Sequence, residues 1–118
     1  MEGTKKYRPG FTDQFSIQIK APQGIRGIHP LTIAVRLNLA LHEIMAHDFP
    51  GVERASIRCG VMRAGLAANS LPEEAWLKGV LSAASPDARA VLHARAEEIT
   101  AATAAAFRAS AVVSWNET

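Results

Sequence analysis

Two strand-like segments stand next to each other in the middle of the chain, with only a short loop between them. Residues 54–64 alternate apolar and polar side chains, Asn69 and Pro72 mark the turn, and residues 75–81 alternate again. Alternation with a period of two is typical of a half-buried strand, and Asn and Pro are favoured in turns. We therefore expect two directly connected antiparallel strands, around which the other elements must be arranged.

The alternation predicts which side chains point into the core. The side chains predicted to face inward are Ile57, Cys59 and Val61 on the first of these strands, and Ala75, Leu77, Gly79 and Leu81 on the second. The side chains predicted to face the opposite side of the sheet are Met62, Trp76 and Val80. The second group would form an exposed patch or meet a partner.

A strand pattern and a helix pattern precede this pair, and a helix and a strand follow it. The expected elements are a strand over Phe15–Lys20, a helix from Pro30 to about His47, a helix from Pro86 to about Arg108 and a strand over Ser110–Trp115. Proline suits the first turn of a helix, and Ser85 provides a hydroxyl cap ahead of Pro86. The inward positions predicted from helical spacing are Ala34, Leu37, Leu41, Ile44 and Met45, and then Ala88, Val91, Leu92, Ile99 and Phe107.

The order strand–helix–strand–strand–helix–strand defines the expected fold class. A chain of 118 residues is enough for one domain with a core of its own. Such a split βαβ repeat forms an α+β, ferredoxin-like sandwich, a four-stranded antiparallel sheet with two helices on one face. We expect residues 1–11 to form a flexible polar tail and residues 12–118 a single domain.

Composition excludes several classes of function. The formal net charge is only +2, and no Lys/Arg cluster is interleaved with aromatic residues, which argues against nucleic acid as a partner. No apolar run approaches the roughly 18–20 residues that span a bilayer, so no membrane partner is expected. The single cysteine, Cys59, reads as a small core residue and fits a reducing compartment. We expect a cytoplasmic protein.

Two histidines in the first helix invite comparison with a zinc-protease motif, but their spacing argues against it. His42 and His47 are five residues apart, whereas the motif needs a spacing of four. A regular helix would turn the second histidine about 140° away from the first. We expect neither metal nor cofactor in this chain. His93 is expected at the surface, and Glu73–Glu74 and Glu97–Glu98 as solvated charges.

The central turn resembles a segment of a known family. The run from Ala64 to Pro72, followed by Glu74–Gly79, resembles the A-G-x-A-x-N-x-x-P…A-x-L-x-G segment of the zinc-dependent aminoacylase/carboxypeptidase-like amidohydrolases, in their smaller, inserted domain. Hippurate hydrolase, allantoate amidohydrolase and succinyl-diaminopimelate desuccinylase are members. The resemblance covers the chain from Phe15 to about Trp115. It implies a ferredoxin-like domain that dimerises and covers an active site, as a lid, without binding the metal.

Two departures from the family pattern bear on function. Active members carry a His in the loop after the first strand, which stabilises an oxyanion in the partner subunit's active site, and an Arg after the third strand, which binds a substrate carboxylate. Here residues 21–28 contain no His, His29 stands at the helix start where the family has Asp, and Ser82 takes the place of the Arg. Of this trio only Asn69 remains. The resemblance implies that Asn69 contacts substrate; alternatively, its amide holds the turn at Pro72.

The expected function is that of an isolated dimerisation or lid domain of a zinc-dependent amidohydrolase or metallopeptidase. The resemblance implies hydrolysis of an N-acyl amino acid or similar amide, with zinc held by a separate catalytic domain and a second copy of this chain as the other partner. The chain alone would be non-catalytic. An alternative is a stand-alone ferredoxin-like module that binds a small ligand or a protein. A complete enzyme is the least supported reading, because no nucleophile, base or metal set is evident.

Overall fold

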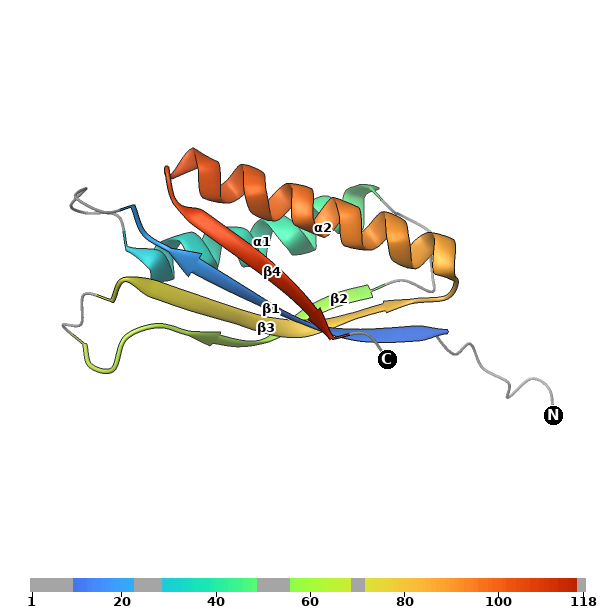
Figure 1. Cartoon of the computed structure of the whole chain (residues 1–118), viewed down its shortest axis with the longest axis horizontal. Helices are drawn as coiled ribbons and strands as arrows, with labels where there is room; N and C mark the ends of the chain where they lie inside the picture. The colour runs from blue at the N-terminus through green and yellow to red at the C-terminus, as the bar shows by residue number, and fades with distance from the viewer. Residues whose placement is uncertain (1–9, 23–28, 49–55, 69–71, 117–118) are drawn as a thin grey trace.

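The computed structural model describes residues 10–22, 29–48, 56–68 and 72–116, with backbone only for residues 46–48. Within these ranges the elements are β1 (Phe11–Lys20), α1 (Pro30–Asp48), β2 (Ser56–Arg63), β3 (Glu74–Ala83), α2 (Pro86–Ala106) and β4 (Ser110–Asn116). The strands form an antiparallel sheet with the order β2-β3-β1-β4, and both helices lie on one face of it (Figure 1). The predicted α+β, ferredoxin-like sandwich is confirmed.

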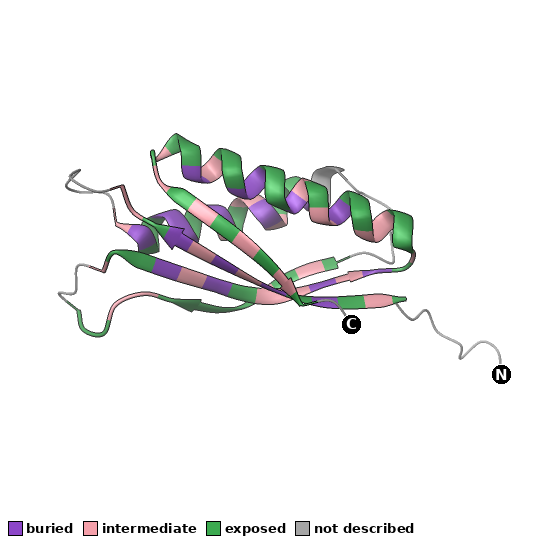
Figure 2. Cartoon of the chain, viewed as in Figure 1, coloured by how far each residue is buried: buried purple, intermediate pink, exposed green. Residues whose placement is uncertain are grey.

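The long first strand organises the sheet, because it is paired on both sides. β1 pairs with β3 along its whole length, from Phe11 opposite Ala83 to Lys20 opposite Glu74. On its other side it pairs with β4 over residues 14–20. α1 packs over β2 and β3, and α2 packs mainly over β4. Buried positions alternate along β1 and β3 and line the helix sides that face the sheet (Figure 2), so the core lies between the two layers.

One predicted strand face is wrong because β2 contains a bulge. The register shifts between Cys59 and Val61, so that Val61 lies opposite Lys78 and Met62 lies opposite Leu77. Directly paired residues point to the same side of a sheet. Val61 therefore lies on the open face and Met62 on the helix side, the reverse of the prediction. An extra residue in one strand exchanges the two faces beyond it.

The β2–β3 contact beside this bulge requires glycine at position 79. A Cβ atom built on Gly79 would lie 2.1 Å from the carbonyl oxygen of Arg58 and 2.6 Å from the ring of Phe15. Gly79 thus allows β2 to approach β3 closely and leaves room for the Phe15 ring. At Gly60, inside the bulge, an added Cβ would meet nothing within 4 Å.

Most predicted inward positions contribute to the core, with one clear error on each helix; on the α2 side Leu92 and Ile99 are buried, whereas Ala88 and Phe107 are only partly buried. Ile44 is 36% exposed and Val91 is 52% exposed, although both were expected to face inward. Ile33, which was not predicted, is buried beside Ala34 and Leu37. A buried stripe follows the line along which the helix touches the sheet, and spacing alone leaves its edges undetermined by about one residue.

The helix ends have identifiable caps. His29 Nδ1 accepts a hydrogen bond from the Leu31 N–H at 3.1 Å, and the Ser85 hydroxyl accepts one from Ala88 N–H at 3.1 Å. At its C-terminus α2 closes with Arg108 in the left-handed region (φ 59°), followed by a bond from Ala109 N–H to the Ala104 carbonyl. This is a Schellman ending with arginine where glycine is preferred.

Candidate functional site

The open face of the sheet presents rows of side chains that cross all four strands. Because paired residues point to the same side, the registers place these rows directly. Three successive rows are Arg58–Val80–Gln14–Asn116, Val61–Lys78–Ser16–Ser114 and Arg63–Trp76–Gln18–Val112. Trp76 and Val80 therefore lie on the predicted face.

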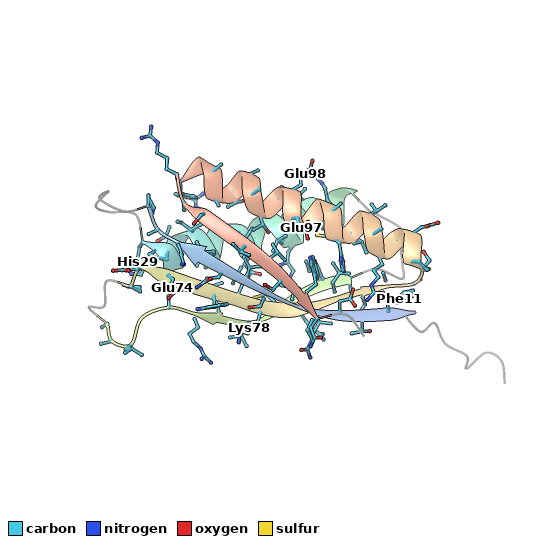
Figure 3. All side chains as sticks on the ribbon, viewed as in Figure 1. Phe11, His29, Glu74, Lys78, Glu97 and Glu98 are labelled. Carbon is cyan, nitrogen blue, oxygen red and sulfur yellow. The ribbon has the colours of Figure 1, made fainter. Side chains whose placement is uncertain are left out.

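The first two rows line a shallow hollow of about 540 Å³. Its charged lining residues are Arg58 on β2 and Lys78 on β3, and the Lys78 side chain projects from the sheet away from the helices (Figure 3). No carboxylate lines the hollow within the described part of the chain. Uncharged polar side chains from β1 and β4 form the opposite wall. This arrangement favours an anionic group with hydrogen-bonding atoms next to it.

The one site residue predicted from the sequence, Asn69, lies outside the described residues. The flanking loop is visible up to Ala68, with Gly65 in the left-handed region (φ 79°). A second shallow hollow of about 470 Å³ lies beside the turn, lined by residues that include Arg63, Pro72 and Trp76. The predicted substrate contact of Asn69 therefore stays a prediction.

The positions at which the chain departs from the family pattern have structural surroundings of their own. The ring of His29 caps α1, the role that Asp or Ser plays at many helix starts. His29 and Glu74 lie at the same end of the domain (Figure 3), where Glu74 accepts a hydrogen bond from the Gln18 side-chain amide. Ser82 lies on the open face opposite Ser56 and Thr12, one row beyond Arg58.

A buried charged cluster, which the sequence reading missed, ties β1 to α2. Asp13 is fully buried, and its two carboxylate oxygens accept bonds from Arg89 Nε at 2.9 Å and Arg89 Nη2 at 2.6 Å. His93 Nε2 lies 2.7 Å from the same carboxylate. An ionised carboxylate only accepts, so this ring nitrogen carries the proton and donates it. We call Asp13, Arg89 and His93 the Asp13 cluster.

Trp115 of β4 extends the cluster to the surface. The His93 ring stacks on Trp115 with 3.7 Å between ring centroids and 5° between planes. Trp115 Nε1–H donates to Glu97 at 2.7 Å, and Arg95 pairs with Glu98 at 2.8 Å. The prediction that His93 lies at the surface is wrong, since its side chain is 15% exposed. Both glutamates are exposed as expected, but each has a partner on the protein.

A sequence signal for the Asp13 cluster was available. Asp13 stands two residues before Phe15 and four before Ile17, and alternate residues of a strand point to the same face. If the predicted strand is extended back to residue 13, its alternation therefore places the Asp13 carboxylate in the core. Arg89 and His93 are four residues apart and so share one face of a helix. A buried carboxylate needs cationic or hydrogen-bonding partners, and this face supplies both.

The described residues offer no site for a metal ion. Among them, no three His, Cys, Asp or Glu side chains gather closely enough to bind one. His42 Nδ1 lies 2.8 Å from the Asn38 carbonyl one turn earlier, so it is engaged with its own helix. His47 belongs to the residues described by backbone alone. The described residues would therefore not hold the zinc that the family resemblance implies for a separate catalytic domain.

The outer surface of α1 carries an apolar stripe. Leu31, Val35 and Leu39 follow one another at intervals of four residues and are 37%, 43% and 51% exposed. The neighbouring strand β2 is at the edge of the described sheet, with Val61 and Met62 exposed at 39% and 36%. Unpaired strand edges and apolar helix stripes are both surfaces that associate with other chains. Within the described ranges, neither helix has the length and hydropathy needed to cross a bilayer.

The fold matches one part of several known amidohydrolases and peptidases. The aminobenzoyl-glutamate utilization protein from Klebsiella pneumoniae superposes with a TM-score of 0.76 and 24% identity, over 92% of this chain and 28% of that one. The YXEP protein of Bacillus subtilis, a dinuclear metal-binding peptidase from the M20 family, gives 0.68 and 22%, over 94% and 27%. A hydantoinase/carbamoylase family amidase from Burkholderia ambifaria gives 0.72 and 14%, over 93% and 29%.

These likenesses define a class of fold. The chain spans under a third of the length of each of these structures, and its fold is that of one segment of M20-type peptidases and amidohydrolases. No protein-family model matches the chain, and no curated protein matches it in sequence. Members of the family suggested by the Ala64–Gly79 segment thus share this fold.

Proposed function

We propose that this chain acts as the dimerisation and lid domain of a metal-dependent amidohydrolase that cleaves N-acyl amino acids or similar amides. The observation that carries the proposal is the fold match, which takes in 92% of this chain and only 28% of a larger protein. A segment of that size within a metal-binding peptidase is one part of a larger catalytic assembly. We place the metal in a separate catalytic domain, and no metal-binding cluster lies among the described residues of this chain.

Self-association is supported by two adjacent surfaces of the α1 side. The exposed Leu31, Val35 and Leu39 stripe lies on the helix that packs over the sheet edge formed by β2. An isologous two-fold dimer would cover the same patch on both copies. Apolar burial of the stripe and pairing of the β2 edges would both stabilise such a dimer.

Light scattering of the purified chain across a range of concentrations tests this role. We expect a dimer, with twice the 12.6 kDa mass of one chain. Leu39→Glu should shift the equilibrium toward monomer by at least about tenfold in Kd, because a buried unpaired carboxylate is costly. Val91→Glu on α2 is the matched control, since Val91 is 52% exposed and Leu39 is 51% exposed. A strict monomer, or equal effects of the two variants, contradicts the proposed dimer.

The non-catalytic part of the proposal has a separate test. The purified chain with added zinc should hydrolyse an N-acyl amino acid no faster than zinc alone, because the part of the chain that the structure describes contains no metal-binding cluster. When a catalytic domain that carries the metal ligands is added, we expect it to bind this chain and form one complex. Hydrolysis by the chain alone would contradict the assignment.

We also propose that Asn69 contacts the substrate in the complex of this chain with its catalytic domain. The substitution Asn69→Ala should then raise the KM of that complex for the substrate.

A second candidate function has an observation in its favour. The cation-lined hollow on the open sheet face suits a small ligand, and a stand-alone binding module would use such a face directly. The two functions differ in what they require. The lid needs self-association and a catalytic partner, whereas the module needs a ligand only.

A further inference from the structure

The hollow on the open face is built from all four strands. It lies over the first two cross-strand rows, and six of its polar lining residues are Arg58, Lys78, Gln14, Ser16, Ser114 and Asn116. Sheet side chains on one face stand roughly parallel to one another, so rows of short polar groups beside long cations leave a depression. Gly60, in the bulge, also lines the hollow and has no side chain, so the wall on the β2 side is low there.

The charges around the hollow are of one sign. Arg58 pairs directly with Val80, and Lys78 stands two residues before Val80 on the same strand. The two cations are therefore diagonal neighbours, roughly 7–8 Å apart at their bases, and their long side chains can reach one point between them. Neither forms an ion pair with another described residue. Lys78 Nζ instead lies 5.8 Å from the centre of the Trp76 ring.

The remaining walls indicate which other chemical groups a ligand in this hollow could carry. Gln14 and Asn116 are neighbours in one row, and Ser16 and Ser114 in the next. Their amides and hydroxyls can donate to and accept from a neutral polar group such as an amide. Val61 and Val80 add an apolar strip beside the cations. An anion, an amide and an apolar group next to one another are the parts of an acylated amino acid.

We propose that this hollow binds the carboxylate of an N-acyl amino acid between Arg58 and Lys78, with the amide over Gln14 and Ser16. The choice of an N-acyl amino acid rests on the proposed function, whereas the anion preference follows from the lining alone. Arg58 presents a planar fork that can hold a carboxylate through two bonds, and Lys78 adds a point charge. Both are binding residues, and the chain carries out no chemical step on the ligand.

The proposal is tested by following the backbone amides of the 15N-labelled chain by NMR during titration with hippurate (N-benzoylglycine). Hippuramide, which replaces the carboxylate by a neutral amide, is the matched probe. We expect hippurate to give saturable shifts at Gln14, Lys78 and Ser114, and hippuramide to give none. The affinity should fall as salt rises from about 0.05 M to about 0.5 M, because the cations are exposed.

Substitutions locate the site. Arg58→Gln should weaken hippurate binding by about tenfold, as expected for loss of a charge-assisted bond, and Lys78→Gln by somewhat less. Arg63→Gln, an exposed cation on the same face in the next row, should leave the affinity within about twofold. The amide spectrum of each variant shows directly whether it is folded, so a loss of binding is not confused with unfolding.

Several results would overturn the inference. One is that hippuramide causes the same chemical-shift changes as hippurate, and another is that Arg58→Gln and Arg63→Gln weaken hippurate binding equally. A third is that the shift changes map to the helices. A fourth is that sulfate displaces hippurate at equal concentration. The last result would indicate a general anion site without preference for a carboxylate and amide. Failure here is distinguishable from failure of the lid role, because light scattering reports dimerisation with no ligand present.

Discussion

The two helices of this domain are held to the same sheet by different kinds of interaction. On the α2 side, the fully buried Asp13 is bonded to Arg89 and His93, and the network extends through Trp115 to Glu97. On the α1 side, the buried residues of the helix in the described part of the chain are all apolar, with Ile33, Leu37 and Leu41 among them. The two polar or charged residues buried in the described part of the chain, Asp13 and Thr100, both belong to the α2 side.

This difference shows how each half is specified. Directional bonds to one buried carboxylate fix the position of α2 along β1, because any slide would leave a charge unpaired. α1 is held by apolar packing, and its outer surface carries the exposed Leu31, Val35 and Leu39 stripe. The neighbouring β2 is one of the two edge strands of the described sheet. Substitutions in the charged α2 half and in the apolar α1 half should therefore affect stability to different extents.

The largest expected effect comes from removal of the buried carboxylate. Asp13→Ala leaves the partly buried Arg89 and His93 without their anion and should lower the free energy of unfolding by about 3–5 kcal/mol. Asp87→Ala is the control, since Asp87 is an exposed first-turn carboxylate, and should cost about 0.5 kcal/mol. Urea unfolding measures both. Equal losses would mean that the cluster is not what holds α2.

On the α1 side, the largest loss of stability is expected from a substitution that adds a side chain where β2 and β3 approach each other closely. Gly79→Ala would place a methyl group 2.1 Å from the Arg58 carbonyl oxygen and 2.6 Å from the Phe15 ring. The strands must then move apart, with an expected loss of about 2–3 kcal/mol. Gly60→Ala meets open space and should stay within about 0.5 kcal/mol of the wild type in the same urea experiment. If the two variants are equally stable, the close approach of β2 to β3 at Gly79 does not contribute to the stability of the domain.

A smaller effect, an increase in stability, is expected from a substitution on the buried face of α2. Thr100 is 1% exposed, and its hydroxyl has no hydrogen-bond partner among the described residues. Thr100→Val keeps the shape and removes the unpaired hydroxyl, so the midpoint of thermal unfolding should rise, by the equivalent of about 1 kcal/mol. Thr103→Val, which is half-buried on the same helix, should change little. A loss of stability in Thr100→Val would reveal a bond to the hydroxyl.

The smallest expected effect is at the end of α2. Arg108 adopts φ 59°, a conformation that costs an L-residue with a Cβ about 1 kcal/mol and glycine almost nothing. Arg108→Gly should therefore raise the free energy of unfolding by about 0.5 kcal/mol, after the greater backbone entropy of glycine is counted. Arg108→Ala keeps the Cβ and should give no gain. Chemical unfolding in parallel separates the two.

Local patterns predicted most of the elements, and they failed where a neighbouring segment decides the outcome. The alternation in β1 and β3 and the Ser85–Pro86 helix start correspond to the observed strands and cap. Val61 and Met62 were assigned to the wrong faces because the bulge in β2 is visible only against its partner strand. His93 was misplaced because its partner Asp13 lies 80 residues away in sequence.

The sequence by itself determined the order of elements, the alternating inward faces of the long strands and the caps, because each depends on residues a few positions apart. The tertiary structure decided the contacts between segments that are distant in sequence. It brought Arg58 and Lys78 together on one face of the sheet, and it enclosed Asp13 between Arg89 and His93. Side chains on different strands become neighbours only once the register is set, and no local pattern encodes that register.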